Sequence, residues 1–255
     1  MLAIVPNNRF LTGSFDQLAM TNLATTPAGE GPARESHTLA TTTQNRLRAD
    51  ILNCTLKPGQ TLRFDWLRET YKISLSPLRE ALMRLIAEGL VQLEDHRGFR
   101  VAPVSIDHLL DLTMVRRETE ALAIRLAIEK GDDHWESFIL ASFNTLSKYP
   151  SKDGRQLFDQ EWEKRHRAFH YSLYAACGSP ILLGSIAHYD NQWSRYRLLS
   201  GRYMNHRRNI QQEHAALKEA VVARNPVKAT EAIQQHISAS TDSILAANEP
   251  IFENS

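Results

Sequence analysis

Hydrophobic residues recur at intervals of three or four along most of the chain after residue 43, which is the spacing of a buried helix face. The pattern predicts one helix within 44–57 and a second over 64–71, separated by a Pro-Gly break. A third helix is predicted from Pro77 to about Glu88. Ser76 precedes it as a good N-cap, and Gly89 follows it as the stop.

The period then changes from helical to alternating. Val91 and Leu93 precede a polar turn at 95–98, and Phe99 and Val101 follow it. Alternation on both sides of a short turn predicts a β-hairpin. Three helices followed by a hairpin within about 60 residues are typical of a winged helix-turn-helix.

After Pro103 the pattern is helical almost to the end of the chain. Helices are predicted over 107–130, 134–148, 156–177, 180–203, 206–224 and 227–246. The predicted fold is therefore mostly α, with a small β wing and a C-terminal all-α antiparallel bundle. The predicted organisation is a flexible leader over 1–42, a DNA-binding domain over 43–104, a bundle for effector binding and dimerisation over 105–246, and a tail over 247–255.

Composition narrows the class of protein. The chain is 42% hydrophobic and 23% charged, which is ordinary for a globular protein. It has two cysteines and lacks a run of 18 apolar residues, so we expect a cytoplasmic location and no membrane span. A net charge of +1 excludes a polybasic protein but leaves room for a local basic face.

The predicted winged helix carries that face. Residues 43–104 contain ten Lys or Arg and seven Asp or Glu, so this segment has a positive surplus that the rest of the chain lacks. A recognition helix reads base edges with its N-terminal residues, and the wing tip approaches a minor groove or a phosphate. The candidate DNA-binding residues are Ser74, Ser76, Arg79, Arg84, Arg97 and Gly98. The simpler interpretation of Arg79 and Arg84 is a solvated helix face.

Four of the ten histidines attract attention because two of them lie four residues apart on one predicted helix. They are His166, His170, His214 and His236. Imidazoles from three helices converging in a bundle would suit a transition metal ion. Spacing alone favours four separate histidines, each hydrogen-bonded to a carboxylate or to the backbone, because two histidines four residues apart occur by chance on many helices.

A longer set of motifs resembles a known family. Ser76-Pro77-Leu78-Arg79-Glu80-Ala81-Leu82, Glu88-Gly89-Leu90-Val91 and Arg97-Gly98-Phe99-Arg100-Val101 resemble the winged helix of GntR-family bacterial transcription regulators. The family usually has an arginine where this chain has Leu75, and a basic residue where it has Asp65. These departures imply an operator different from the common one.

The bundle resembles the FCD effector domain of the FadR subgroup of that family. The matching stretches are Val115-Arg116, Arg167-Ala168-Phe169-His170, Gly178-Ser179-Pro180, Glu213-His214 and 225–236. The resemblance implies a metal ion held by an aspartate and three histidines, and His166 stands where the family has the aspartate. A neutral imidazole in place of a carboxylate should favour zinc or nickel over harder ions.

FCD domains bind small organic acids, so the resemblance also implies a carboxylate effector. Arg116 falls on the family's inward arginine, and Arg195 and Arg197 lie on a helix that lines the pocket in the family. The other interpretation of Arg116 is an ion pair with Glu120, one helical turn away. Trp162 and Trp193 are expected in the core.

The sequence therefore predicts a homodimeric, ligand-responsive repressor that binds a palindromic operator in double-stranded DNA. With His166 in that place and Leu-Ser-Pro in the turn, the chain resembles the branch of the family around the carbon-starvation-induced regulator CsiR. This resemblance implies a short dicarboxylate effector. The alternatives are a metal- or metabolite-binding module without DNA binding and a metal-dependent enzyme. We expect no enzyme, because the chain lacks a His-Glu-x-x-His motif.

Overall fold

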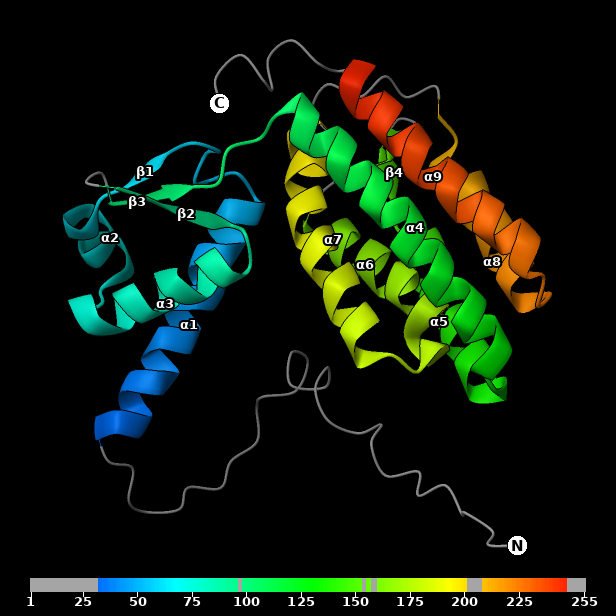
Figure 1. The fold of residues 1–255 in the computed structure, drawn as a ribbon, viewed down its shortest axis with the longest axis horizontal. Helices are drawn as coiled ribbons and strands as arrows, with labels where there is room; N and C mark the ends of the chain where they lie inside the picture. Colours follow the sequence, from blue (N-terminus) through cyan, green and yellow to red (C-terminus); the bar gives the residue numbers. More distant parts are fainter. Residues whose placement is uncertain (1–31, 96–97, 153–154, 157–159, 201–207, 247–255) are drawn as a thin grey trace, which may run out of the picture.

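The structure is a computed structural model that describes residues 32–95, 98–152, 155–156, 160–200 and 208–246. Two bodies lie side by side in it (Figure 1). The first holds three helices and a small sheet, and the second is a bundle of helices. The predicted fold class, a winged helix-turn-helix followed by an all-α bundle, is confirmed.

The first helix, α1 (Pro32–Leu52), begins earlier than the sequence pattern predicts. The sequence pattern predicts a leader up to residue 42, because the tract from Ser36 to Thr43 is polar and lacks a sustained period. The structure corrects this prediction: Ala40, Thr43 and Leu47 are buried on one face of the helix. Before Leu47 this face carries small and hydroxyl side chains, so a scan for large apolar residues misses it.

The helix-turn-helix consists of α2 (Phe64–Tyr71) and α3 (Leu75–Ala87). Between them Lys72 adopts a left-handed conformation, with φ 54°, that turns the chain. Ser74, not Ser76, is the N-cap of α3, and its side chain makes no capping hydrogen bond with the described residues. Pro77 therefore lies in the first turn, where backbone N–H groups have no intrahelical acceptor and a proline costs little.

The wing is a three-stranded antiparallel sheet in the order β1-β3-β2. β2 (Val91–Glu94) and β3 (Gly98–Val101) form the predicted hairpin, with Leu93 opposite Phe99. The sequence analysis missed β1 (Thr61–Leu62), whose two residues pair with Arg100 and Phe99. Two residues are too short for an alternating pattern, and only pairing with β3 makes this segment a strand.

The bundle begins at Ser105, whose hydroxyl caps α4 (Ile106–Lys130) by accepting a hydrogen bond from the backbone of His108. The remaining helices follow in sequence: α5 (Asp133–Ser147), α6 (Gln160–Tyr174), α7 (Pro180–Ser200), α8 (Ile210–Val222) and α9 (Pro226–Ala246). A short 3-10 turn, Ala175–Cys177, separates α6 from α7.

The start of α6 differs from the prediction, which placed a helix over 156–177. The structure instead has two short paired strands, β4 (Ser151–Lys152) and β5 (Arg155–Gln156), before the helix begins at Gln160. The predicted end at 203 and the predicted start at 206 both fall within 201–207, outside the described residues.

The bundle has two clusters of buried apolar residues, of which the smaller includes Leu109 on α4, Trp193 on α7 and Ile244 on α9. The larger is built mainly from the inward faces of α4, α5, α6, α8 and α9, and α4 and α9 make the most extensive contact. Trp135, Trp162 and Phe169 are among its large buried side chains. Across the described ranges, none of the helices is both long and apolar enough to span a bilayer.

Helix α7 lies on the side of the bundle that faces the winged helix (Figure 1). The Tyr196 hydroxyl donates a hydrogen bond to the carbonyl of Ser105, and the Arg195 guanidinium donates one to the carbonyl of Ala102. His108 bridges the Tyr196 hydroxyl and the Gln192 amide, at 2.8 and 2.9 Å. The contacts of Arg195 and Tyr196 join residues 102–105, the linker between the wing and α4, to helix α7 of the bundle.

Candidate functional site

The start of α3 presents the predicted DNA-contacting residues to solvent. Ser74, Ser76 and Arg79 are all exposed. Arg79 makes no hydrogen bond or ion pair with any residue that the structure describes. The apolar side of α3, with Leu78, Leu82 and Leu85 among its buried residues, belongs to the core of the winged helix. Arg79 is therefore available for an external partner.

The other predicted DNA contacts differ in their surroundings. Arg84 is half-buried: its guanidinium donates to Thr41 Oγ1 on α1 at 3.0 Å and pairs with Glu80 on its own helix. Gly98 begins β3 with φ 85°, a conformation that favours glycine, at the tip of the wing. Arg97 lies outside the described residues.

The four predicted histidines come together inside the bundle. His166 and His170 lie on α6, His214 on α8 and His236 on α9, and all four are buried. One ring nitrogen of each lies within 4.8 Å of the corresponding atoms of the others. Three helices far apart in sequence thus place four imidazoles around one point.

The ring nitrogens are positioned as ligands. Nε2 of His170 and Nε2 of His214 lie 3.3 Å apart. Two nitrogens bound at 2.0–2.1 Å to one tetrahedral zinc ion are separated by about 3.3–3.4 Å. Within the described residues, the buried Nδ1 atoms of His166 and His170 have no hydrogen-bond partner. This donor set fits a transition metal ion.

The surroundings keep the imidazoles neutral, which is the form that binds metals. Burial lowers the pKa of His166, His170 and His214 well below the usual histidine value. The neighbouring imidazoles and nearby arginines lower it further. Burial also lowers the pKa of His236, although its hydrogen bond to Glu213 acts in the opposite direction.

Glu213, which precedes His214 on α8, contacts another histidine of the cluster. Its carboxylate Oε2 lies 2.9 Å from Nδ1 of His236, and Arg208 pairs with the same carboxylate. A carboxylate that accepts from Nδ1 leaves Nε2 of that histidine free to bind a metal and fixes the ring orientation. His214 is therefore a candidate ligand itself, and its neighbour Glu213 on α8 supports a second candidate ligand, His236 on α9.

Two predicted arginines line the cluster and are already paired. Arg116 donates from Nε to Glu120 at 2.8 Å and lies over the Trp193 ring, so the predicted helical ion pair is present. Arg197 pairs with Glu163, again with a 2.8 Å hydrogen bond from Nε. Both arginines contribute to the lowered pKa of His170, which places their charges close to the histidines.

The third predicted effector arginine lies elsewhere. Arg195 is 1% exposed and faces the winged helix, where it bonds to Ala102. Asp190, which the sequence analysis did not single out, joins the bundle's charge network through Arg167 at 2.7 Å and Arg197 at 3.6 Å. Burial acts to raise the pKa of Asp190, but these arginines outweigh it and lower the pKa.

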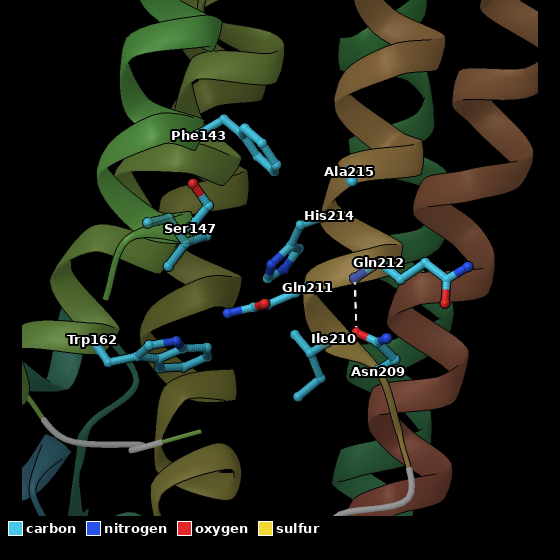
Figure 2. Close-up of a pocket in the computed structure, with 10 residues that line it drawn as sticks. Phe143, Ser147, Trp162, Asn209, Ile210, Gln211, Gln212, His214 and Ala215 are labelled. Carbon is cyan, nitrogen blue, oxygen red and sulfur yellow. Dashed lines mark hydrogen bonds between the residues drawn. The ribbon is translucent and has the colours of Figure 1, made fainter. Parts of the chain in front are cut away.

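A cavity of about 320 Å³ opens beside the cluster. Figure 2 shows His214 pointing into this space, with Phe143 and Trp162 on one side and Ile210 and Gln211 on the other. The Trp162 ring also stacks on His166, with ring centres 4.5 Å apart. The cavity therefore reaches the cluster at His214, through a mostly apolar and amide-lined opening.

Comparison with known proteins agrees with both halves of this architecture. Residues 39–101 match the bacterial regulatory proteins of the gntR family, and residues 111–239 match the FCD domain. The chain is a GntR-family transcription regulator with an FCD domain. As a DNA-binding regulator, it is not an enzyme.

Relatives of this GntR regulator include two proteins of similar length. This chain is 35% identical to the HTH-type transcriptional regulator BphR of Paraburkholderia xenovorans, and the match covers 82% of this chain and 86% of BphR. It is 36% identical to the HTH-type transcriptional repressor GlaR of Escherichia coli, over 75% of this chain and 89% of GlaR. The solved structure of E. coli McbR has the same fold, with a TM-score of 0.68, 21% identity, and coverage of 82% of this chain and 97% of McbR.

Proposed function

We propose that this GntR regulator is a cytoplasmic homodimeric repressor that binds a palindromic operator and releases it when a small carboxylic acid enters the bundle. The observation that carries the proposal is the attachment of a buried, metal-competent histidine cluster to a winged helix with a free arginine on its recognition helix. The relative GlaR is named a repressor, which supports the direction of regulation.

The histidine cluster supports the effector half of the proposal. His166, His170, His214 and His236 would hold the ion, and an all-nitrogen donor set favours zinc or nickel. A bound transition metal supplies an electrophilic position for an effector carboxylate. Arg116 and Arg197 lie close enough to the histidines to affect their pKa values, so a second carboxylate would meet a guanidinium there.

The acid would have to compete with carboxylates that the protein already supplies. Glu120 and Glu163 occupy the two guanidinium groups in this structure. A dicarboxylate that displaces one of them would gain a charge-assisted pair and release the glutamate. We therefore propose a short dicarboxylate as the effector, as the resemblance to the branch around CsiR also suggests.

Helix α7 is the proposed route from the effector site to the DNA-binding domain. Its Arg197 lies at the histidine cluster, while Arg195 and Tyr196 bond to the linker after the wing. A carboxylate that rearranges Arg197 would change the position of α7 and hence of the winged helix. The effector shifts the population of DNA-binding arrangements only by its differential affinity for them.

The proposed homodimer uses the outer face of α4. Ile106, Leu110 and Met114 are exposed there at intervals of four residues. Asp111 lies three residues before Met114 and Arg117 three residues after it, so an antiparallel copy of the helix that crosses at Met114 would bring opposite charges together. Light scattering tests the dimer: Met114→Glu should convert it to a monomer, and a monomeric wild type would contradict the proposal.

The DNA half of the proposal is tested with an operator obtained by in vitro selection from genomic fragments. Arg79→Ala should weaken operator binding by about 1–3 kcal/mol, measured by fluorescence anisotropy. Arg125→Ala, which removes an exposed arginine from α4, is the matched control and should bind as the wild type does. Unchanged affinity of a folded Arg79→Ala variant would exclude α3 as the reading helix.

The effector half is tested by thermal shift with a panel of short mono- and dicarboxylates. A dicarboxylate should raise the melting temperature, and the same compound should release the selected operator. Addition of a chelator should reduce both effects. If no acid in the panel changes either measurement, the carboxylate proposal fails while the DNA-binding assignment stands.

A further inference from the structure

Two large apolar side chains lie exposed on the same face of α3 as Arg79. Leu75 is 49% exposed and Met83 is 51% exposed. Leu75, Arg79 and Met83 follow one another at intervals of four residues, so they form one stripe on the helix surface. At 1.5 Å per residue the stripe is about 12 Å long.

Most of the remaining surface of α3 contacts other elements of the winged helix. Its buried face packs against α1 and β2, and Arg84 is tied to α1 through Thr41. Among the residues that the structure describes, Arg79 has no hydrogen-bond or ion-pair partner, whereas Arg84 has both. The stripe, together with the exposed Ser76 at the helix start, is thus the part of the recognition helix that an external ligand can contact.

A stripe of two apolar residues around one arginine matches a particular pattern of base edges. In the major groove, arginine binds the O6 and N7 acceptors of guanine, whereas the C5-methyl group of thymine is the apolar feature. The leucine side chain has no hydrogen-bonding atom and the methionine thioether is only a weak acceptor, but both can cover a methyl group.

We infer that Leu75 and Met83 are specificity-determining residues that read thymine methyl groups on the two sides of a guanine bound by Arg79. Residues four apart on the helix are separated by about 6 Å, and base pairs by about 3.4 Å. Each thymine therefore lies about two base pairs from the guanine in the half-site. The inference rests on the proposed role of α3 as the recognition helix.

The test removes only the methyl group from the DNA. The selected operator is synthesised with each thymine of the half-site replaced in turn by deoxyuridine, and binding of the full-length protein is measured by fluorescence anisotropy. Loss of one buried methyl group should weaken wild-type binding about fourfold at each of two positions. Leu75→Ala should abolish the effect at one position and Met83→Ala at the other.

Leu140→Ala is the matched control, because Leu140 is 44% exposed on α5 in the other domain. This variant should retain both uracil effects. The inference is overturned if the operator binds but no uracil substitution weakens it, or if both alanine variants retain the full wild-type losses. Failure to select any operator would instead contradict the proposed role of α3, so the two failures are distinguishable.

Discussion

Nε2 of His170 on α6 faces Nε2 of His214 on α8 at 3.3 Å, in the interior of the bundle. Both rings are buried and have a lowered pKa, so each presents a neutral imidazole. One hydrogen bond between the two nitrogens satisfies a single donor and acceptor. A shared metal ion satisfies both lone pairs, which is why the arrangement favours an ion.

Metal content is the first prediction. Protein purified without a nickel column should contain about one transition metal ion per chain, measured by mass spectrometry. The double variant His170→Ala, His214→Ala should lose it, because two of four ligands are removed. Chelator should lower the melting temperature of the wild type, since a ligand that binds only the folded state stabilises it.

The control for this experiment is His134→Ala, which removes an exposed histidine from α5 and should leave the metal content unchanged. Circular dichroism distinguishes the possible roles of the cluster. A folded but metal-free double variant supports a metal site. A wild type that is folded and metal-free would contradict it.

The second prediction concerns Glu213, whose carboxylate supports His236 and has a pKa lowered to about 2. Burial acts to raise this pKa, but the hydrogen bonds with His236 and Arg208 outweigh it. Glu213→Gln removes the negative charge behind the imidazole and should weaken metal binding by about 10–100-fold, as loss of an outer-shell partner does. Competition with a fluorescent chelator measures this.

Glu219→Gln is the matched control for that variant, because Glu219 lies exposed on the same helix. It should bind the metal as the wild type does. Equal affinity of the Glu213→Gln variant and the wild type would mean that the glutamate only anchors Arg208.

The third prediction uses His108, which bridges α4 and α7 within the bundle through Tyr196 and Gln192. Burial lowers the pKa of His108 below its usual value of 6.5, and the charge of Arg195 acts in the same direction. The folded state therefore binds fewer protons than the unfolded state just below pH 6.5, so the free energy of unfolding falls as the pH decreases through that value. The His108→Gln substitution removes this titration. The free energy of unfolding of the variant should therefore fall less between pH 7.5 and 5.5 than that of the wild type.

Urea unfolding of both proteins at the two pH values gives the comparison. The histidines of the cluster titrate in both proteins, so they cancel in the difference between them. An identical loss of stability in the wild type and the variant would show that His108 does not contribute to acid sensitivity.

The fourth prediction compares alanine substitutions at two glycines, Gly89 and Gly184. Gly89 ends α3 with φ 70°, and a methyl group there would lie 3.1 Å from Nε2 of Gln192 on α7. Gly89→Ala should lower the free energy of unfolding by about 1–2 kcal/mol, because the left-handed conformation is strained for alanine and the domain contact is tight. Guanidinium denaturation measures the change.

Gly184 provides the opposite case. It lies on α7, and an added methyl group meets no described atom within 4 Å. Gly184→Ala should therefore raise the free energy of unfolding by about 0.5–1 kcal/mol through its higher helix propensity. Destabilisation of similar size by both substitutions would contradict this distinction between a domain contact and a free helix surface.

Elements with large apolar residues at regular spacing were predictable from the sequence. The bounds of α2 agree with the pattern, because Leu67 and Tyr71 are buried one turn apart. The hairpin is where the pattern predicts it, and Val91, Phe99 and Val101 are buried, although Leu93 is exposed. The start of α1 was missed because its buried face includes Ala40 and Thr43. The strand β1 was missed because its pairing with β3 is non-local.

Local motifs and residue types were enough to predict the family, the order of the two domains and the four histidines. The packing of the helices then determines what those residues face. It turned Arg195 toward Ala102 rather than the histidines, and it brought Glu213 to His236 across two helices. These relationships depend on how helices rotate and pack against one another, which spacing along a single helix does not specify.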